Sequence, residues 1–257
     1  MSNRNHRRAL GQNYLVDPVI LFEITRAINP KKNDLIFEIG PGMGALTNLL
    51  HGSERELIAM DLDPKNISFL QDKFSHEKHD FIHGDVLHHS LDFLRNGNYK
   101  IVGNLPYNIS TQIILKLIHF TDHINDMHFL VQKEVAQRIC AKESTRNWGR
   151  LGIKLGVFFE SEILFDVPPE AFDIKPKVQS SLIRLIPRKE SKIFLKDFKS
   201  FSSFIDQAFS SKRKSIKNNI KKLNCDIEAL NINPISRAEE LTLDNFVNIF
   251  NTLEIED

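Results

Sequence analysis

The run Leu35-Ile36-Phe37-Glu38-Ile39-Gly40-Pro41-Gly42-Met43-Gly44 decides the fold class of this 257-residue chain. Its apolar first half predicts a buried strand, and the helix-like run Ala45-Leu46-Thr47-Asn48-Leu49-Leu50 follows the glycines. Glycine lets a backbone pass close to a ligand, and the start of a helix favours electronegative groups. The glycines lack the spacing of the dinucleotide fingerprint, because Ala45 stands where the third Gly is required.

Further strand-like runs follow at intervals long enough for helices. We predict strands at Leu35–Glu38, Glu56–Asp61, Asp80–Ile82, Lys100–Val102 and Met127–Val131, and an antiparallel hairpin from Lys154–Leu164 and Ser180–Ile186. The alternation predicts a parallel, doubly wound, Rossmann-like α/β sheet, which the hairpin closes. Ligands of such sheets bind beyond the carboxyl ends of the strands.

The strand pattern stops at Pro187, after which apolar residues recur at helical spacing. We therefore predict an α/β domain over residues 1–187 and a small all-helical domain over residues 188–257. The phenylalanines between Phe198 and Phe209 are expected to form its core, and Thr242 is a candidate N-cap. We expect Lys212–Asn219 to continue the first helix or to open the next.

The composition indicates a globular cytoplasmic protein. The sequence is 41% hydrophobic, has two cysteines without metal-ligand spacing, and contains no apolar run near eighteen residues. Arg4, Arg7 and Arg8 precede no apolar segment of a signal peptide. We expect a soluble, unprocessed chain with no disulfide, no metal and no membrane partner, and we expect a monomer.

The charge is unevenly distributed. Arg184–Lys222 holds 12 Lys or Arg and 3 acids, whereas Leu223–Asp257 holds 1 Arg and 8 acids. Such a basic segment is either a solvated helix face or the contact surface for a phosphate backbone. Because a candidate active site lies in the same chain, we favour RNA.

Two acids follow the glycines at successive strand ends. Asp61 is placed to accept the hydroxyls of a ribose, and Asp85, in Gly84-Asp85-Val86, is placed to accept from the exocyclic amine of an adenine. The first of three successive strands is followed by glycines, and Asp61 and Asp85 stand at the ends of the next two. This pattern predicts a site for S-adenosylmethionine. The alternative is that both acids only cap their strands.

The six residues Gly103-Asn104-Leu105-Pro106-Tyr107-Asn108 close the strand Lys100–Val102 with groups suited to an amino group on a flat ring. The Asn104 side-chain oxygen and the Leu105 carbonyl, which Pro106 holds rigid, both accept from an NH₂. Tyr107 offers a stacking face. The sequence therefore predicts a site for a target amine beside a methyl donor.

Six segments resemble, in order and nearly end to end, the bacterial 16S ribosomal RNA adenine N6,N6-dimethyltransferase family. They are Gly11–Leu15, Glu38–Thr47, Gly84–Val86, Gly103–Ser110, Val131–Arg138 and Val167–Ser180; Phe209–Lys214 is also similar to a basic helix of that family. The resemblance implies a class I methyltransferase domain, a helical RNA-binding domain, and N6,N6-dimethylation of two adjacent adenosines near the 3′ end of 16S ribosomal RNA. The implied partner is the assembling small ribosomal subunit.

The resemblance also implies residue roles. The cofactor would contact Asn13, Leu15, Gly40, Asp61, Asp85 and Asn104; the target adenine would meet Asn104, Leu105, Tyr107 and Phe172; and RNA would contact Arg7, Arg8, Lys212, Arg213, Lys214 and Lys217. The sequence departs from the family pattern at Tyr14 (usually Phe), Asp61 (usually Glu), Ile174 (usually Pro) and Gln179 (usually Asp).

Two other functions remain open from the sequence. The first is dimethylation of 23S ribosomal RNA, because those enzymes share the cofactor motifs and the Asn-Leu-Pro-Tyr run. The second is a ribosome-assembly factor that has lost catalysis. The intact Asn104, Pro106 and Tyr107 favour an enzyme over the second.

Overall fold

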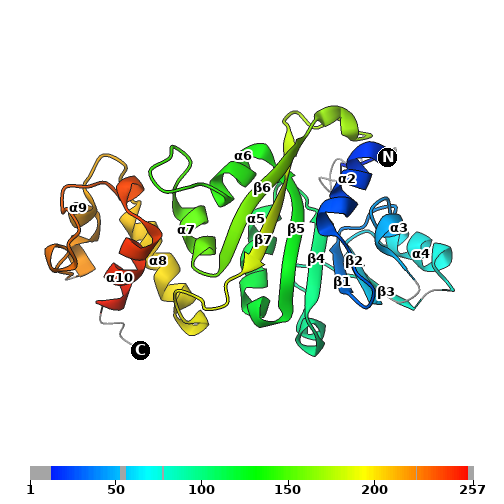
Figure 1. The fold of residues 1–257 in the computed structure, drawn as a ribbon, viewed down its shortest axis with the longest axis horizontal. Helices are drawn as coiled ribbons and strands as arrows, with labels where there is room; N and C mark the ends of the chain where they lie inside the picture. Colours follow the sequence, from blue (N-terminus) through cyan, green and yellow to red (C-terminus); the bar gives the residue numbers. More distant parts are fainter. Residues whose placement is uncertain (1–12, 53–55, 77, 224, 254–257) are drawn as a thin grey trace. The chain divides into compact units, whose positions relative to one another are not determined.

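The computed structural model describes residues 13–52, 56–76, 78–223 and 225–253. Its strands form one sheet in the order β3-β2-β1-β4-β5-β7-β6 (Figure 1). The neighbours among β1 to β5 are parallel, as the sequence predicted, and β7 is antiparallel to β5. The strands are β1 Leu35–Ile39, β2 Glu56–Asp61, β3 His79–His83, β4 Tyr99–Asn104, β5 Ile124–Gln132, β6 Phe159–Val167 and β7 Ser180–Pro187.

Helices connect the parallel strands and make up most of the chain after β7. The α-helices are α2 Pro18–Ile28, α3 Thr47–Leu50, α4 Pro64–Lys73, α5 Ser110–Leu117, α6 Lys133–Ile139, α7 Arg150–Gly156, α8 Phe198–Ala208, α9 Ile216–Ile220 and α10 Leu243–Asn251. The 3-10 helices are η1 Asp92–Asn96, η2 Ile118–His123, η3 Pro169–Ala171, η4 Leu195–Asp197, η5 Lys221–Leu223, η6 Glu228–Leu230 and η7 Ala238–Glu240. No helix in these described ranges is long and apolar enough to cross a membrane.

The predicted run Lys154–Leu164 is wrong as a single strand. Residues 154–156 end helix α7, and β6 begins only at Phe159. Val157, Phe158 and Phe159 are consecutive and all buried, so the middle of the run shows no strand alternation. A short apolar run does not distinguish a buried helix from a buried strand.

Parallel register brings the carboxyl ends of the first four strands to one edge of the sheet. Ile39 of β1 lies opposite Met60 of β2, and Asp61 lies opposite His83 of β3. The next residues extend this alignment, because the Gly40 amide donates to the Met60 carbonyl (2.9 Å) and the Gly84 amide donates to the Asp61 carbonyl (3.0 Å). The glycine loop and both acids therefore meet at this edge.

Helix α2 packs on one face of the sheet. Asp17 caps it by accepting from the amides of Val19 and Ile20, and Pro18 occupies its first turn, where a missing N–H costs nothing. The buried side chains of this helix join an apolar cluster with residues from β1, β2, β4, β5 and β7. Its members include Leu21, Ile24, Ile28, Ile36, Leu57, Val102, Leu130 and Leu182. Burial of this face fixes the segment that leads into α2, which carries Asn13 and Tyr14.

The chain divides into two compact units. The first comprises residues 1–136 and 162–187, and the second comprises residues 137–161 and 188–257. The predicted division into domains at residue 187 stays a prediction, and the units differ from it because residues 137–161 pack with the helical residues. Trp148, which lies in residues 137–161, makes one such contact, because its indole N–H donates to the Leu241 carbonyl (2.9 Å).

Phenylalanines form the core of the second unit, as predicted. Phe201 and Phe204 of α8 are buried and contact Phe250 of α10, with ring centroids 5.2 and 6.0 Å away. Thr242 caps α10 by accepting from the Asn245 amide. These rings are core side chains rather than a platform for stacked bases.

Candidate active site

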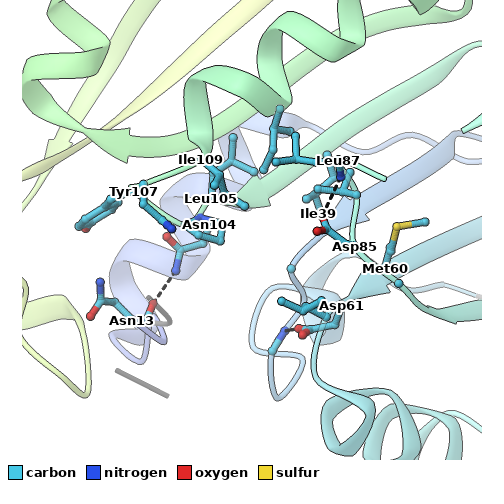
Figure 2. Close-up of a pocket in the computed structure, with 18 of the residues that line it drawn as sticks. Asn13, Ile39, Met60, Asp61, Asp85, Leu87, Asn104, Leu105, Tyr107 and Ile109 are labelled. Atoms are coloured by element: carbon cyan, nitrogen blue, oxygen red, sulfur yellow. Dashed lines mark hydrogen bonds between the residues drawn. The ribbon is translucent and has the colours of Figure 1, made fainter. Parts of the chain in front are cut away.

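A cavity of about 380 Å³ lies at the carboxyl ends of β1, β2, β3 and β4. Figure 2 shows Asn104, Leu105 and Tyr107 on one side of it and Asp61 and Asp85 on the other. Its lining also includes Asn13, Tyr14, Ile39, Gly40, Gly42, Met60, Leu62, Gly84, Val86, Leu87, His88, Pro106, Asn108, Ile109 and Ile113. The structure therefore brings together the predicted donor residues Asn13, Gly40, Asp61, Asp85 and Asn104 with the target residues Leu105 and Tyr107.

The glycine loop after β1 needs glycine for both conformation and space. Gly40, Gly42 and Gly44 have φ values of 70°, 56° and 77°, a region that other residues seldom adopt. A Cβ on Gly42 would lie 2.9 Å from Cε1 of Tyr14. The loop thus passes directly against the Tyr14 ring.

Asp61 is held by three hydrogen bonds from the protein itself. Its Oδ1 accepts from the Asp63 amide (2.8 Å), and its Oδ2 accepts from the Gly42 amide (3.0 Å) and from Nδ2 of Asn66 (3.1 Å). Burial raises the pKa of the Asp61 carboxyl above its usual value, although these bonds oppose the shift. A carboxylate offers about four acceptor positions. About one position therefore remains for a ligand hydroxyl.

Asp85 is more accessible than Asp61. Its Oδ1 accepts from the Leu87 amide (2.8 Å), and its Oδ2 lies 2.8 Å from Nδ1 of His88. Burial raises the pKa of Asp85, but these bonds outweigh burial and place the pKa below its usual value. An ionised, half-exposed carboxylate at the cavity wall is a suitable acceptor for an amine.

Lys116 of α5 holds the loop that carries Asp85. Its ammonium donates to the carbonyls of Val86 (2.9 Å), Leu87 (3.0 Å) and His89 (2.7 Å). An ammonium has three N–H donors, so all of them are used. Burial lowers the pKa of Lys116, and the charge of Asp85 opposes this shift.

The Asn104 amide has a defined orientation. Its Nδ2 donates to the Asn13 backbone carbonyl (2.7 Å), as Figure 2 shows. A carbonyl only accepts, so this contact assigns the amide nitrogen to Asn13. The Asn104 side-chain oxygen is left as the acceptor at the end of β4.

Tyr107 is fixed through its hydroxyl, which lies 2.6 Å from the hydroxyl of the buried Ser180. Burial raises the pKa of the Tyr107 phenol, so the group stays protonated near neutral pH. The Leu105 amide donates to the Leu130 carbonyl (3.1 Å). Both predicted target residues are thus anchored to the neighbouring strands β5 and β7.

A second cavity of about 270 Å³ lies beside the first, and Tyr14, Gly40 and Asn104 line both. Leu15 lines this second cavity and not the first. Glu38 also lines it; burial raises the pKa of its carboxyl to about 7, and Oε2 accepts from the Thr47 hydroxyl (2.7 Å). Glu38 lies in β1, two residues before Gly40, and no role for it was predicted from the sequence.

Phe172 lines neither cavity. Its side chain is 3% exposed within the apolar cluster under α2, and its backbone pairs with that of Leu15. Stacking of Phe172 on a target base would require the ring to leave this cluster, so that role stays a prediction.

The predicted RNA-contacting residues fall into three groups. Arg7 and Arg8 lie outside the described residues. Lys212, Arg213 and Lys214 are exposed in the turn between α8 and α9, so the prediction that Lys212–Asn219 is helical is correct only from Ile216. The ammonium of Lys217, on α9, lies 2.8 Å from Oε1 of Glu228. Residues 212–214 form a turn, and Ser215 occupies the N-cap position of α9 with an extended backbone, so the helix begins only at Ile216.

Sequence reasoning missed Asn66 and Lys116, which lie on helices and reach the site through side-chain bonds. Asn66 could have been found because it lies four positions before Leu70, on the same face of α4. Leu70 is buried, so a polar residue on that face must also be buried. No comparable signal marks Lys116. Among the described residues, no group of three or more His, Cys, Asp or Glu side chains is arranged to hold a metal ion.

The fold and the site define a class I methyltransferase. The described chain superposes on a dimethyladenosine transferase from Plasmodium falciparum with a TM-score of 0.80 at 25% identity, covering 91% of this chain and 95% of that one. A 23S rRNA methyltransferase, ErmE, shares the fold with a TM-score of 0.75 at 21% identity, covering 94% and 99%.

Residues 3–254 match the family model for ribosomal RNA adenine dimethylase, and the chain belongs to that family. It is 40% identical over 261 residues to the ribosomal RNA small subunit methyltransferase A of Neisseria meningitidis serogroup C, covering 98% of both chains. It is 42% identical over 248 residues to the protein of that name from Nitrosospira multiformis, covering 95% of both. The chain is therefore a ribosomal RNA adenine dimethyltransferase.

Proposed function

We propose that this enzyme transfers methyl groups from S-adenosylmethionine to N6 of two adjacent adenosines near the 3′ end of 16S ribosomal RNA, within the assembling small subunit. Family membership and the names of relatives 40% identical over nearly the whole chain support the small-subunit substrate. The observation that carries the chemistry is the fixed Asn104 amide, which keeps its oxygen as an acceptor beside the donor cavity.

The donor cavity suits an adenosyl group. Asp85 would accept from the adenine amine, and Asp61 would accept a ribose hydroxyl at its remaining acceptor position. Gly40 and Gly42 line the cavity and have no side chain, so a ligand can approach the backbone closely there. When bound, S-adenosylmethionine supplies a methyl group on a sulfonium, whose departure leaves a neutral thioether.

The residues at the end of β4 would prepare the target nitrogen. The N6 lone pair of adenine is delocalised into the ring. Hydrogen bonds accepted from N6–H by the Asn104 oxygen and the Leu105 carbonyl favour a pyramidal nitrogen with its lone pair directed into the cavity. Orientation of this kind supplies roughly 7–11 kcal/mol in well-aligned reactions. No strong base is needed, because the amine loses its proton readily once it has been methylated.

Tyr107 would receive the unstacked base. Removing an adenosine from its stack costs a few kcal/mol, and stacking on one aromatic ring returns about 1–3 kcal/mol. The bond between the Tyr107 and Ser180 hydroxyls holds the ring ready for this contact.

The decisive experiment maps dimethylated adenosines in ribosomal RNA from cells with and without the gene. Loss of dimethylation at adjacent adenosines of 16S RNA supports the proposal, and restoration by the wild-type gene completes the test. Purified enzyme should methylate assembling small subunits. Methylation of naked 23S RNA instead would support the alternative substrate, and no methyl incorporation into either would support a non-catalytic assembly factor.

Asp61→Asn is expected to weaken cofactor binding by about 1.5–3 kcal/mol. An amide at this position cannot accept from all three donors that now face the carboxylate, so the glycine loop and the ribose contact both lose support. Calorimetric titration with S-adenosylhomocysteine measures the loss. Asp92→Asn, at an exposed carboxylate outside the cavity, is the matched control. Unchanged affinity in Asp61→Asn would mean that Asp61 only caps the end of its strand and does not contact the cofactor.

Replacing Lys212, Arg213, Lys214 and Lys217 together by Gln is expected to flatten the salt dependence of RNA binding. Each lost phosphate contact should reduce the log–log slope by about 0.7–0.9. Lys217→Gln alone is the internal control, because its pairing with Glu228 already offsets its charge. Affinity for S-adenosylhomocysteine should not change. An unaltered slope in the quadruple variant would move the search for the RNA surface to Lys133–Arg138 and the N-terminal arginines.

A further inference from the structure

Asn66 is a buried polar residue on a helix face that is otherwise apolar. Its side chain is 3% exposed, beside the buried Ile67 and Leu70 of α4. It does not line either cavity. A buried amide is costly unless both of its ends are hydrogen-bonded. The two partners of Asn66 both belong to the cavity wall.

The amide joins Asp61 to Tyr14. Its Nδ2 donates to Oδ2 of Asp61 (3.1 Å), and its Oδ1 accepts from the Tyr14 hydroxyl (3.2 Å). A carboxylate only accepts, which fixes the orientation of the amide. Tyr14 and Asp61 are also two positions at which the sequence departs from the family pattern, and Asn66 connects them.

At the Asp61 end, the amide shares Oδ2 with the Gly42 backbone. Without Nδ2, the Gly42 amide at 3.0 Å would be the remaining described donor to that oxygen. Because Asp61 is 4% exposed, water does not readily replace the lost bond. The direction of the carboxylate therefore depends on Asn66.

At the Tyr14 end, the amide anchors the segment that closes the cavity. The Tyr14 ring lies against Gly42, and the Tyr14 amide donates to Oδ1 of Asp173 (3.2 Å). The preceding residue, Asn13, supplies the carbonyl that orients Asn104. One side chain thus links the ribose end of the cavity to the segment beside the target amine.

We infer that Asn66 is a positioning residue of the donor site, which sets cofactor affinity by orienting Asp61 and Tyr14 without touching the ligand. The inference rests on the proposed function, because it takes the donor to be an adenosyl compound. Removal of the amide should raise the dissociation constant and the KM for S-adenosylmethionine, whereas kcat at saturating cofactor should change much less.

Asn66→Leu removes both hydrogen bonds at similar volume. Titration with S-adenosylhomocysteine should show a dissociation constant about tenfold higher, and Tyr14→Phe should raise it by about threefold. In the double variant the two effects should not add, since both variants break the same chain of bonds. Asn219→Leu is the matched control, because Asn219 is a buried amide of the second unit that donates to the Ala208 and Ser211 carbonyls. It should lower thermal stability and leave the affinity unchanged.

Asn66→Asp tests the donated bond itself, because it keeps the shape of the side chain and replaces the NH₂ by oxygen. Two facing carboxylates repel until they share one proton, which restores the bond. The affinity of this variant, relative to wild type at the same pH, should therefore improve severalfold between pH 8 and pH 6. Glu38 and Asp63 also act on the charge of Asp61, and Asn66 is flanked by Lys65 on its own helix. Because Glu38 acts on Asp61 in both proteins, the ratio to wild type removes the part of the pH dependence that the two proteins share.

The outcomes separate the inference from the proposed function. Folded Asn66→Leu with wild-type affinity, or a pH-independent ratio for Asn66→Asp, overturns the inference and leaves the proposed function intact. Wild-type protein that does not bind S-adenosylhomocysteine overturns both. Because Asn66→Asp is nearly isosteric, its pH ratio decides the question even if Asn66→Leu does not fold.

Discussion

Asn104→Ala is expected to reduce methyl transfer by about 100-fold at saturating cofactor, a change of about 2.7 kcal/mol in the activation free energy. The substitution removes the acceptor that would hold N6–H and also the bond to the Asn13 carbonyl. Binding of S-adenosylhomocysteine should weaken but stay measurable, because Asp61 and Asp85 are untouched. Single-turnover incorporation of labelled methyl groups into small subunits measures the rate.

Asn125→Ala is the control for this substitution. Asn125 likewise donates from Nδ2 to a backbone carbonyl, that of Asn98 (3.2 Å), but it lies at the amino end of β5. Its loss should leave the rate within about twofold of wild type. A rate above about a tenth of wild type in Asn104→Ala would exclude the proposed role of the amide.

Gly103→Ala is expected to destabilise the protein by about 3 kcal/mol or more. A Cβ at this position would lie 2.5 Å from the Ile39 carbonyl oxygen, a backbone atom of the adjacent strand β1. The backbone cannot rotate away as a side chain would, so β1 and β4 must separate at the cavity edge. Activity should fall as well, because Asn104 follows directly.

Calorimetry should show a fall in Tm of roughly 6–12 °C for Gly103→Ala. Gly149→Ala is the matched control, since a Cβ on Gly149 meets no atom within 4 Å. Equal melting temperatures for Gly103→Ala and wild type would mean that the two strands tolerate the added methyl group.

The sheet could be predicted from the sequence because its signals are local. The apolar runs at β1, β2 and β4 end in glycine, an acid and asparagine, and parallel strands necessarily bring those ends to one edge. The hairpin strand that was expected to begin at Lys154 shows the limit. The stretch from Leu155 to Phe159 is apolar across the end of α7 and the start of β6, and only packing of α7 within the second unit decides where the helix ends.

The sequence could predict which residues form the site, but not which of their donor and acceptor atoms remain for a ligand. That depends on hydrogen bonds between residues distant in sequence. The sequence places Asp61 at a strand end, but it does not show that Gly42, Asp63 and Asn66 already occupy most of its acceptor positions. For the same reason the sequence could not place Phe172 in the cluster under α2. Motifs identify which groups are present, and tertiary hydrogen bonds decide which remain available.

The ammonium of Lys116 has a consequence for turnover. With Val86, Leu87 and His89 held by one cation, the loop is ordered when the protein folds, so little conformational entropy is lost when the donor arrives. In the proposed reaction, four methyl groups on two adenosines would consume four donors, and each spent molecule would have to leave before the next one enters. Because the loop is already ordered, it does not have to refold each time the product leaves and a new donor binds. This property suits an enzyme that repeats one reaction on a single RNA.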